Sequence, residues 1–139
     1  MKTRTKAAVF ALALLASAGC GTEAKQPDFP DLNPVKGVVT RSGRSVSGGS
    51  VRFTPDPAQS DFVVNSEVGT DGTFSLTTVR TTDSKGERKP GAPAGKYKMT
   101  YTPPLGDQAT GGPTGPVELP TPVMVKVGDN NVTVDLPKK

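Results

Sequence analysis

The sequence predicts an all-β domain over residues 35–139, a seven-stranded antiparallel β-sandwich of Greek-key type. Short runs there alternate apolar and polar residues, and this period of two is typical of strands with one buried face. Turn residues separate the runs, in a chain that holds 16 glycines and 14 prolines. No run after residue 19 has the period of an amphipathic helix, so a regular series of short strands favours a sandwich.

Each run has one face that we expect to be buried. In chain order, the inward residues are Val35, Gly37 and Val39; Val51 and Phe53; Val68 and Thr70 at the end of the third run; Phe74 and Leu76; Tyr97, Met99 and Tyr101; Val123, Val125 and Val127; and Val132, Val134 and Leu136. Glycine within a strand often marks a close approach of two backbones, so Gly37 is expected to lie at such a contact.

Turn chemistry predicts the connections. Ser42-Gly43 marks a turn, and Asp71-Gly72 is a strong hairpin signal because glycine accepts the positive φ that such turns require. Arg80–Pro93 is predicted to be a polar loop and Pro103–Pro122 a long loop rich in proline and glycine. Residues 128–131 turn the chain before the last run.

Residues 1–19 have the three parts of a secretory signal peptide, for which we expect a helical segment. Lys2, Arg4 and Lys6 are followed by nine apolar residues, Ala7–Leu15, and then by small residues. This run is too short to span a bilayer, which takes about 20 residues. The end of the signal, Ser17–Cys20, resembles the cleavage site of bacterial lipoproteins, with serine where leucine is commonest.

Cys20 is the only cysteine in the chain, and the resemblance implies that it becomes the lipidated N-terminal residue. Ala16-Ser17-Ala18 leaves a second possibility open, because an ordinary signal peptidase could cut after Ala18 and release a soluble protein. Residues 20–34 are polar and contain three prolines, so they are predicted to be a tether between lipid and domain. The alternative is an irregular first strand lying on the domain.

Four segments in order resemble the carboxypeptidase regulatory-like domain. They are Val35–Thr40, Ser47–Phe53, Thr70–Leu76 and Gly91–Thr100. The resemblance covers roughly residues 35–136 and implies a transthyretin-like sandwich. More narrowly, the chain is similar to small bacterial lipoproteins made of a signal, a tether and one such domain. The family is generally non-catalytic, so the resemblance implies no catalytic residue.

The residue inventory argues against an enzyme. The chain has no histidine, and its one cysteine is assigned to lipid, which excludes Ser-His-Asp and Cys-His catalysis and the usual zinc sites. The nearest carboxylate pairs, Asp56/Asp61 and Asp83/Glu87, fall in predicted loops. Asp129-Asn130-Asn131 supplies too few oxygens for calcium by itself and is explained by a turn. We therefore expect neither a catalytic site nor a metal or other cofactor.

Two further patterns bear on function. Lys36 and Asn131 could form an intramolecular Lys–Asn isopeptide bond of the kind found in surface adhesins, with Glu67 as the assisting acid, but the alternation points Lys36 to water and not into the buried site that this reaction needs. Arg80, Lys85, Arg88 and Lys89 give the Arg80–Pro93 loop a positive charge that could contact an anionic polymer, although Asp83 and Glu87 dilute it.

Charge and composition limit the classes of partner that the protein can have. Removal of the signal leaves 14 basic residues against 13 acidic ones, so no basic patch suggests nucleic acid. We expect a non-catalytic lipoprotein that displays a structural or protein-binding sandwich at the cell envelope, held to the membrane through Cys20. The outer membrane is favoured if there are two, because Gly21 is not the aspartate that retains many lipoproteins at an inner membrane. The alternative is a glycan- or polymer-binding module, secreted or anchored, which exposed aromatic side chains on a sheet face would favour.

Overall fold

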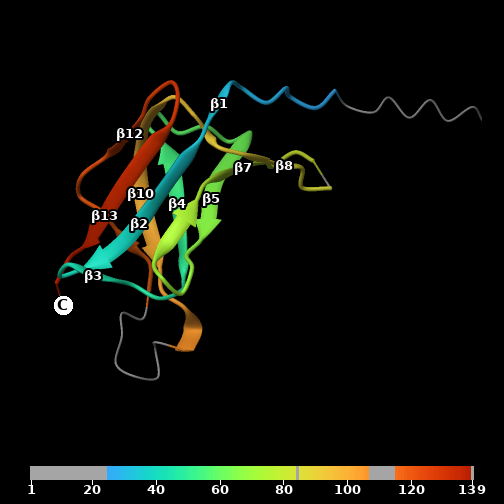
Figure 1. The fold of residues 1–139 in the computed structure, drawn as a ribbon. Coiled ribbons are helices and arrows are strands. Elements are labelled where there is room, and N and C mark those ends of the chain that lie inside the picture. The colour runs from blue at the N-terminus through green and yellow to red at the C-terminus, as the bar shows by residue number, and fades with distance from the viewer. Residues whose placement is uncertain (1–24, 84, 107–114, 139) are drawn as a thin grey trace, which may run out of the picture.

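The computed structural model describes residues 25–83, 85–106 and 115–138, and these form two packed β-sheets (Figure 1). The regular structure consists of strands apart from a short 3₁₀ turn at residues 105–106, and no α-helix occurs in the described residues, which confirms the all-β prediction. The predicted signal helix and Cys20 lie outside the described residues.

The larger sheet has seven strands. Its order is β11 (Val117–Glu118), β10 (Gly95–Thr102), β4 (Ser50–Pro55), β5 (Phe62–Glu67), β7 (Thr77–Arg80) and β8 (Arg88–Pro90), and β12 (Val123–Val125) also pairs with β10. The smaller sheet has four strands. Its order is β13 (Asn130–Leu136), β2 (Val35–Arg41) and β3 (Arg44–Ser45), and β6 (Thr73–Ser75) also pairs with β2. A separate short pair joins β1 (Leu32–Asn33) to β9 (Ala92–Pro93).

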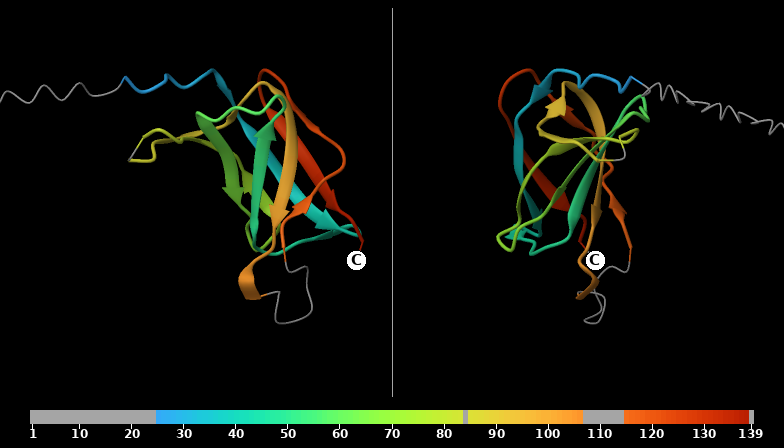
Figure 2. Two further views of the ribbon diagram at one scale, coloured as in Figure 1. Left: turned by 180° about the vertical axis from the view of Figure 1, so that it is seen from behind. Right: turned by 90° about the vertical axis from the view of Figure 1, so that its right-hand side faces the viewer.

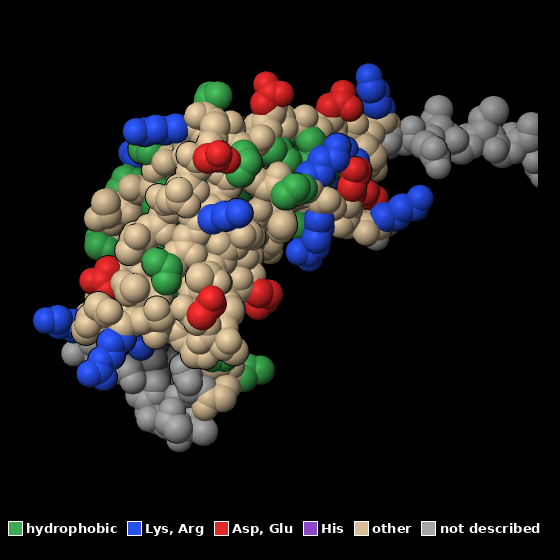
Figure 3. All heavy atoms as spheres, viewed as in Figure 1, with side chains coloured by type: hydrophobic (Ala, Val, Ile, Leu, Met, Phe, Trp, Pro, Cys, Tyr) green, Lys and Arg blue, Asp and Glu red, His purple; other side chains and the backbone are tan. Residues whose placement is uncertain are grey.

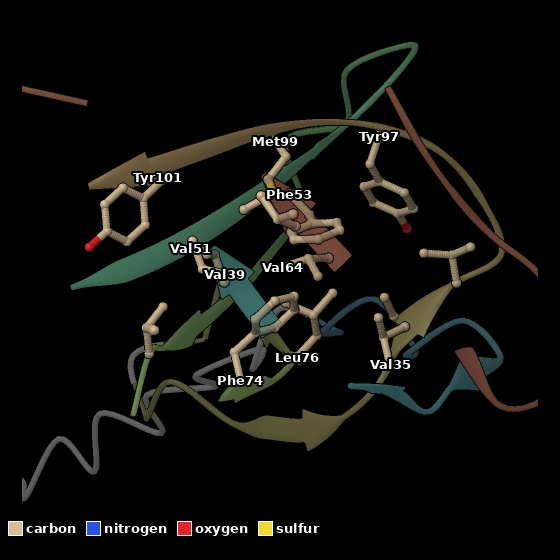
Figure 4. Packing of buried hydrophobic residues seen from close by; sticks show 14 of the residues in the cluster. Val35, Val39, Val51, Phe53, Val64, Phe74, Leu76, Tyr97, Met99 and Tyr101 are labelled. Atoms are coloured by element: carbon tan, nitrogen blue, oxygen red, sulfur yellow. The ribbon is translucent and has the colours of Figure 1, made fainter. Parts of the chain in front are cut away.

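The hydrophobic core fills the space between the two sheets (Figure 4). Phe53 stands at its centre, with its ring 6.1 Å from the rings of both Phe74 and Tyr97. Most of the predicted inward residues are buried, including Val39, Met99 and Val134. The prediction was wrong at two positions: Val127 follows β12 and is 87% exposed, and Thr70 is exposed in a turn.

Gly37 lies where the sequence predicted a close approach. A Cβ atom built there would lie 2.5 Å from Cζ of Phe74 and would also overlap the carbonyl oxygen of Val132. Gly37 pairs with Phe74 on β6 and with Val132 on β13. The missing side chain therefore lets the Phe74 ring cover the middle of β2.

The Asp71-Gly72 signal marks a tight turn, as predicted, but not a hairpin. Gly72 has a φ of +83°, and the Gly69 N–H donates to the carbonyl oxygen of Thr73. However, β5 before the turn belongs to the larger sheet, whereas β6 after it pairs with β2 in the smaller one. The chain then crosses back at Leu76 to form β7. A local turn motif predicts that the chain reverses direction, but it does not predict which sheet each flanking strand joins.

The prediction of purely antiparallel sheets was wrong for one pair. β13 runs parallel to β2, in register from Asn130 opposite Val35 to Leu136 opposite Arg41. The other strand pairs are antiparallel. The first and last long strands of the domain are thus neighbours, a long-range pairing that no local pattern reveals.

The predicted Arg80–Pro93 loop contains two short strands. Arg88–Pro90 forms β8 and pairs with β7, and Ala92–Pro93 forms β9. Thr78, on β7, is fully buried and donates through Oγ1 to the carbonyl oxygen of Gly91 at 2.8 Å.

Candidate functional site

The N-terminal segment is docked on the domain from Gln26 onward, which differs from a tether extending to Pro34. Thr82 donates through Oγ1 to the side-chain oxygen of Gln26 at 2.7 Å, and Leu32–Asn33 pairs with Ala92–Pro93. The alternative interpretation, an irregular first strand, describes this part of the chain. We call residues 26–33 with their contacts on the β7–β8 hairpin and β9 the N-terminal clamp.

Asn33 fixes the inner end of the clamp. Its side chain is buried, and its Oδ1 accepts a hydrogen bond of 2.8 Å from the Gly128 N–H. Gly91 makes room for it, because a Cβ atom there would lie 2.6 Å from the Asn33 carbonyl oxygen. Loss of this hydrogen bond would leave a buried polar group without a partner and lower the free energy of unfolding by about 1–3 kcal/mol. The polar residue before Pro34 is therefore structural.

Phe29 fixes the outer end of the clamp. Its ring centre lies 5.4 Å from that of Phe62 in a tilted arrangement, and 4.6 Å from both Cζ of Arg80 and Nζ of Lys89. Two cations at this distance are attracted by the ring quadrupole, at about 0.5–1 kcal/mol each in exposed sites. The single aromatic residue between Pro27 and Pro30 thus binds both strands of the hairpin.

The charges around Phe29 neutralise one another. Arg80 Nη1 lies 3.1 Å from Oε2 of Glu87 and 4.0 Å from Oδ2 of Asp83, and Lys89 Nζ lies 3.8 Å from Oε1 of Glu87. Basic and acidic side chains are intermingled at this end of the molecule (Figure 3). Of the four cations expected to attract an anionic partner, Arg80 and Lys89 therefore form ion pairs within the domain. Lys85 and Arg88 remain exposed.

The predicted carboxylate pairs have structural partners. Asp83 and Glu87 come together, but around Arg80. Asp56 forms an ion pair of 3.4 Å with Lys96, while Asp61 accepts a hydrogen bond of 3.5 Å from Ser60 Oγ. Within the described ranges, no three acidic residues are grouped as a metal would require.

The Asp129-Asn130-Asn131 turn is held by one side chain. Asn130 accepts through Oδ1 from the Lys126 N–H, and its amide nitrogen donates to the carbonyl oxygens of Lys126 and Gly128, all at 2.8 Å. These bonds account for the asparagine as a turn residue. Lys36 and Asn131 are register partners on adjacent strands, but both are exposed, and Glu67 lies in the other sheet. The three residues are therefore not gathered in a buried site.

Two titrating groups have shifted pKa values. Burial raises the pKa of Tyr97 to about 12, and its hydroxyl donates to the Pro93 carbonyl oxygen at 2.7 Å. The hydroxyl and then the N–H of Thr73 hold the pKa of the Asp71 carboxyl below its usual value. The Tyr97 hydroxyl and the Asp71 carboxyl therefore stabilise local structure through these hydrogen bonds.

The outer face of the smaller sheet carries a shallow hollow of about 410 Å³. Its lining includes the exposed side chains of Lys36, Thr73, Ser75, Asn131 and Thr133. This surface is polar and offers hydrogen-bond donors and acceptors, but no aromatic side chain is exposed on it. It was not found from the sequence, because it depends on the pairing of β6, β2 and β13.

Comparison with known proteins finds no matching family model, no matching curated protein and no matching solved structure. Among the described residues, there is also no helix with the length and apolarity needed to span a membrane.

Proposed function

We propose that this chain is a non-catalytic membrane lipoprotein of the cell envelope that carries a carboxypeptidase regulatory-like sandwich. Cys20 is its lipidation site, and the domain serves structural or protein-binding roles. The observation that carries the proposal is the N-terminal clamp, because it makes residues 26–33 part of the domain rather than a passive linker. With Cys20 attached to the membrane, this docking would fix the position of the domain relative to the lipid.

The clamp limits how far the domain stands from the membrane. Gln26 is six residues after Cys20, and an extended chain spans at most about 20 Å over that length. The end of the sandwich that bears the clamp then faces the lipid surface. The turn at Ser42-Gly43, between β2 and β3, lies at the opposite end and faces away (Figure 2).

The positions of the aromatic residues favour display over glycan binding. Modules that bind sugars on a sheet face usually present exposed aromatic rings. All six aromatic side chains after Cys20 are buried or half-buried here: Phe29, Phe53, Phe62, Phe74, Tyr97 and Tyr101. A protein partner that uses backbone and polar contacts is therefore the better fit.

Metabolic labelling tests the proposal. Cells grown with an alkyne analogue of palmitate are expected to yield a labelled protein in the membrane fraction. Cys20→Ser is expected to lose the label and to leave that fraction. Ser17→Leu, which introduces the commonest residue of lipoprotein signals, serves as the control and should keep the label. A soluble, unlabelled product that begins at Gly19 would contradict lipidation and support ordinary secretion.

A further inference from the structure

Strand β13 has one pairing partner in the part of the chain that the structure describes. It pairs with β2 along its whole length of seven residues, and no strand pairs with its other side. An edge strand presents a row of unpaired N–H and C=O groups, which makes it a template for another extended chain.

The hydrogen bonds identify which residues face the open edge. The Asn130 N–H donates to the Pro34 carbonyl oxygen at 2.9 Å, and the Val134 carbonyl oxygen accepts from Thr40 Oγ1, so these residues point toward β2. Alternate residues of a strand direct their backbone groups to opposite sides. The N–H and C=O groups of Asn131, Thr133 and Asp135 therefore point to the open edge, and their side chains are exposed.

The edge lacks the usual protection against pairing. Natural edge strands are blunted by proline, lysine, bulges or inward-pointing charges. Asn130–Leu136 contains no proline or lysine, and its one charged residue, Asp135, points outward and accepts a hydrogen bond of 3.0 Å from Thr40. Val132, Thr133 and Val134 have high strand propensity. A long, regular edge of this kind is suited to receive a strand.

The inner face of β13 is apolar. Val132 is half-buried and packs against the core, and Val134 and Leu136 on the same face are buried. The inward side chains of an added strand would lie beside these residues. Its other side chains would lie beside Asn131, Thr133 and Asp135. The occupant that fits is therefore a segment with alternating apolar and polar residues.

The position of the anchor argues against a second copy of this chain. The β13 strand starts at the clamped end, where Gly128 bonds to Asn33, and it ends at the opposite end of the sandwich (Figure 1). Two copies paired antiparallel through β13 would place their clamped ends at opposite ends of the dimer. With about 20 Å of chain between lipid and clamp, both could not be anchored in one bilayer. This step rests on the proposed function.

We infer that the open edge of β13 binds an extended segment of a partner protein as an added strand. Backbone hydrogen bonds to residues 131, 133 and 135 supply the affinity, and the alternating side chains supply the selectivity. The partner's apolar side chains cover Val132, and a basic side chain opposite Asp135 is favoured.

Amide hydrogen exchange on the full lipidated protein in detergent micelles tests the inference. The probe is an acetylated, amidated heptapeptide, Lys-Val-Thr-Val-Thr-Val-Lys, whose valines share one face. Saturating peptide is expected to slow exchange of the Asn131, Thr133 and Asp135 amides by about tenfold or more. The same peptide with N-methyl groups on its edge-facing amides is expected to give no protection.

Two variants at one position separate backbone from side-chain recognition. Thr133→Pro removes the N–H that faces the edge but no bond to β2, so the domain should fold and lose the peptide. Thr133→Ala keeps the N–H and should retain the peptide. If the proline variant does not fold, the N-methylated peptide tests the same backbone hydrogen bonds on the wild-type protein.

Three results would overturn the inference. They are the absence of protection by the peptide, protection by the N-methylated peptide that equals that of the parent, and protection of these amides without peptide that grows with protein concentration. The last result would assign the edge to a second copy. Peptide binding does not require lipid, so a failure here is distinguishable from a failure of labelling at Cys20.

Discussion

The guanidinium carbon of Arg80 lies 4.6 Å from the centre of the Phe29 ring, while Nη1 of the same arginine lies 3.1 Å from Glu87. One side chain thus joins the N-terminal segment to the β7–β8 hairpin. Its Nε is buried without a hydrogen-bond partner, so the contact with the ring and the ion pairs hold it in place. Phe29 therefore holds the outer end of the clamp, while Asn33 holds the inner end.

Phe29→Ala is expected to release the N-terminal segment while leaving the sandwich folded. Loss of the two cation contacts and the Phe62 ring contact should lower the free energy of unfolding by about 1–3 kcal/mol. Urea titration measures this loss, and changes in the NMR resonances of Gln26 and Thr82, which share a side-chain hydrogen bond, show the release. Asp28→Ala, at an exposed neighbour, is the control. Equal stabilities of the two variants would contradict the role of the ring.

Phe74→Ala is expected to lower the free energy of unfolding by about 3–5 kcal/mol, because it leaves a cavity beside Phe53 and Gly37. That is a large fraction of the stability of a small domain. Ser75→Ala changes the next, exposed residue of β6 and should have little effect. The two variants are compared by denaturant titration. A similar loss from both would show that the assigned faces of β6 are wrong.

Gly37→Ala is expected to destabilise the domain by about 1–3 kcal/mol, because the added methyl group overlaps the Phe74 ring and the Val132 carbonyl oxygen. Gly106→Ala is the matched control, since nothing lies within 4 Å of a Cβ atom there. Thermal unfolding followed by circular dichroism distinguishes the two. An unchanged melting temperature for Gly37→Ala would contradict the close packing of β2 and β6.

Tyr97 is expected to make stability fall at high pH. Its pKa is raised from the ordinary value of 10.0 to about 12 in the fold. The folded state therefore keeps the proton that the unfolded state releases, and the resulting stability is present below pH 10 and is lost as the pH rises toward 12. Urea titrations across this range should show a smaller decline for Tyr97→Phe than for wild type. Identical declines would contradict a role of the Tyr97 hydroxyl.

The sequence predicted the features that depend on residues close together in the chain, namely the strands and their buried faces. The alternation around Phe53, Phe74 and Met99 identified both the strands and their buried faces, because side chains on a strand alternate between solvent and core. Gly37 was also identified, since glycine inside such a run commonly marks a close contact between backbones. The parallel pairing of β2 with β13 was missed because it joins segments about 95 residues apart, a distance that periodicity does not cover.

The candidate sites were predicted less well than the strands. The Arg80–Pro93 segment was assigned as a loop because charge and proline concealed the short strands β8 and β9. Phe29 lay in a segment with three prolines and no period, so nothing local indicated that it would contact Arg80 and Lys89. The open edge of β13 follows only from the sheet order. These features depend on tertiary contacts between segments that each look irregular.

If Cys20 is lipidated as proposed, the clamp is expected to hold the domain in a defined orientation on the membrane. Cys20 is the only cysteine, so an introduced cysteine can be labelled once Cys20 is acylated. A fluorophore at Lys85→Cys, beside the clamp, or at Arg44→Cys, at the far end, is measured in vesicles containing lipids with a quencher in the headgroup. We predict strong quenching at position 85, weak quenching at position 44, and a smaller difference after Phe29→Ala. Equal quenching at the two positions in the protein with Phe29 intact would contradict the account.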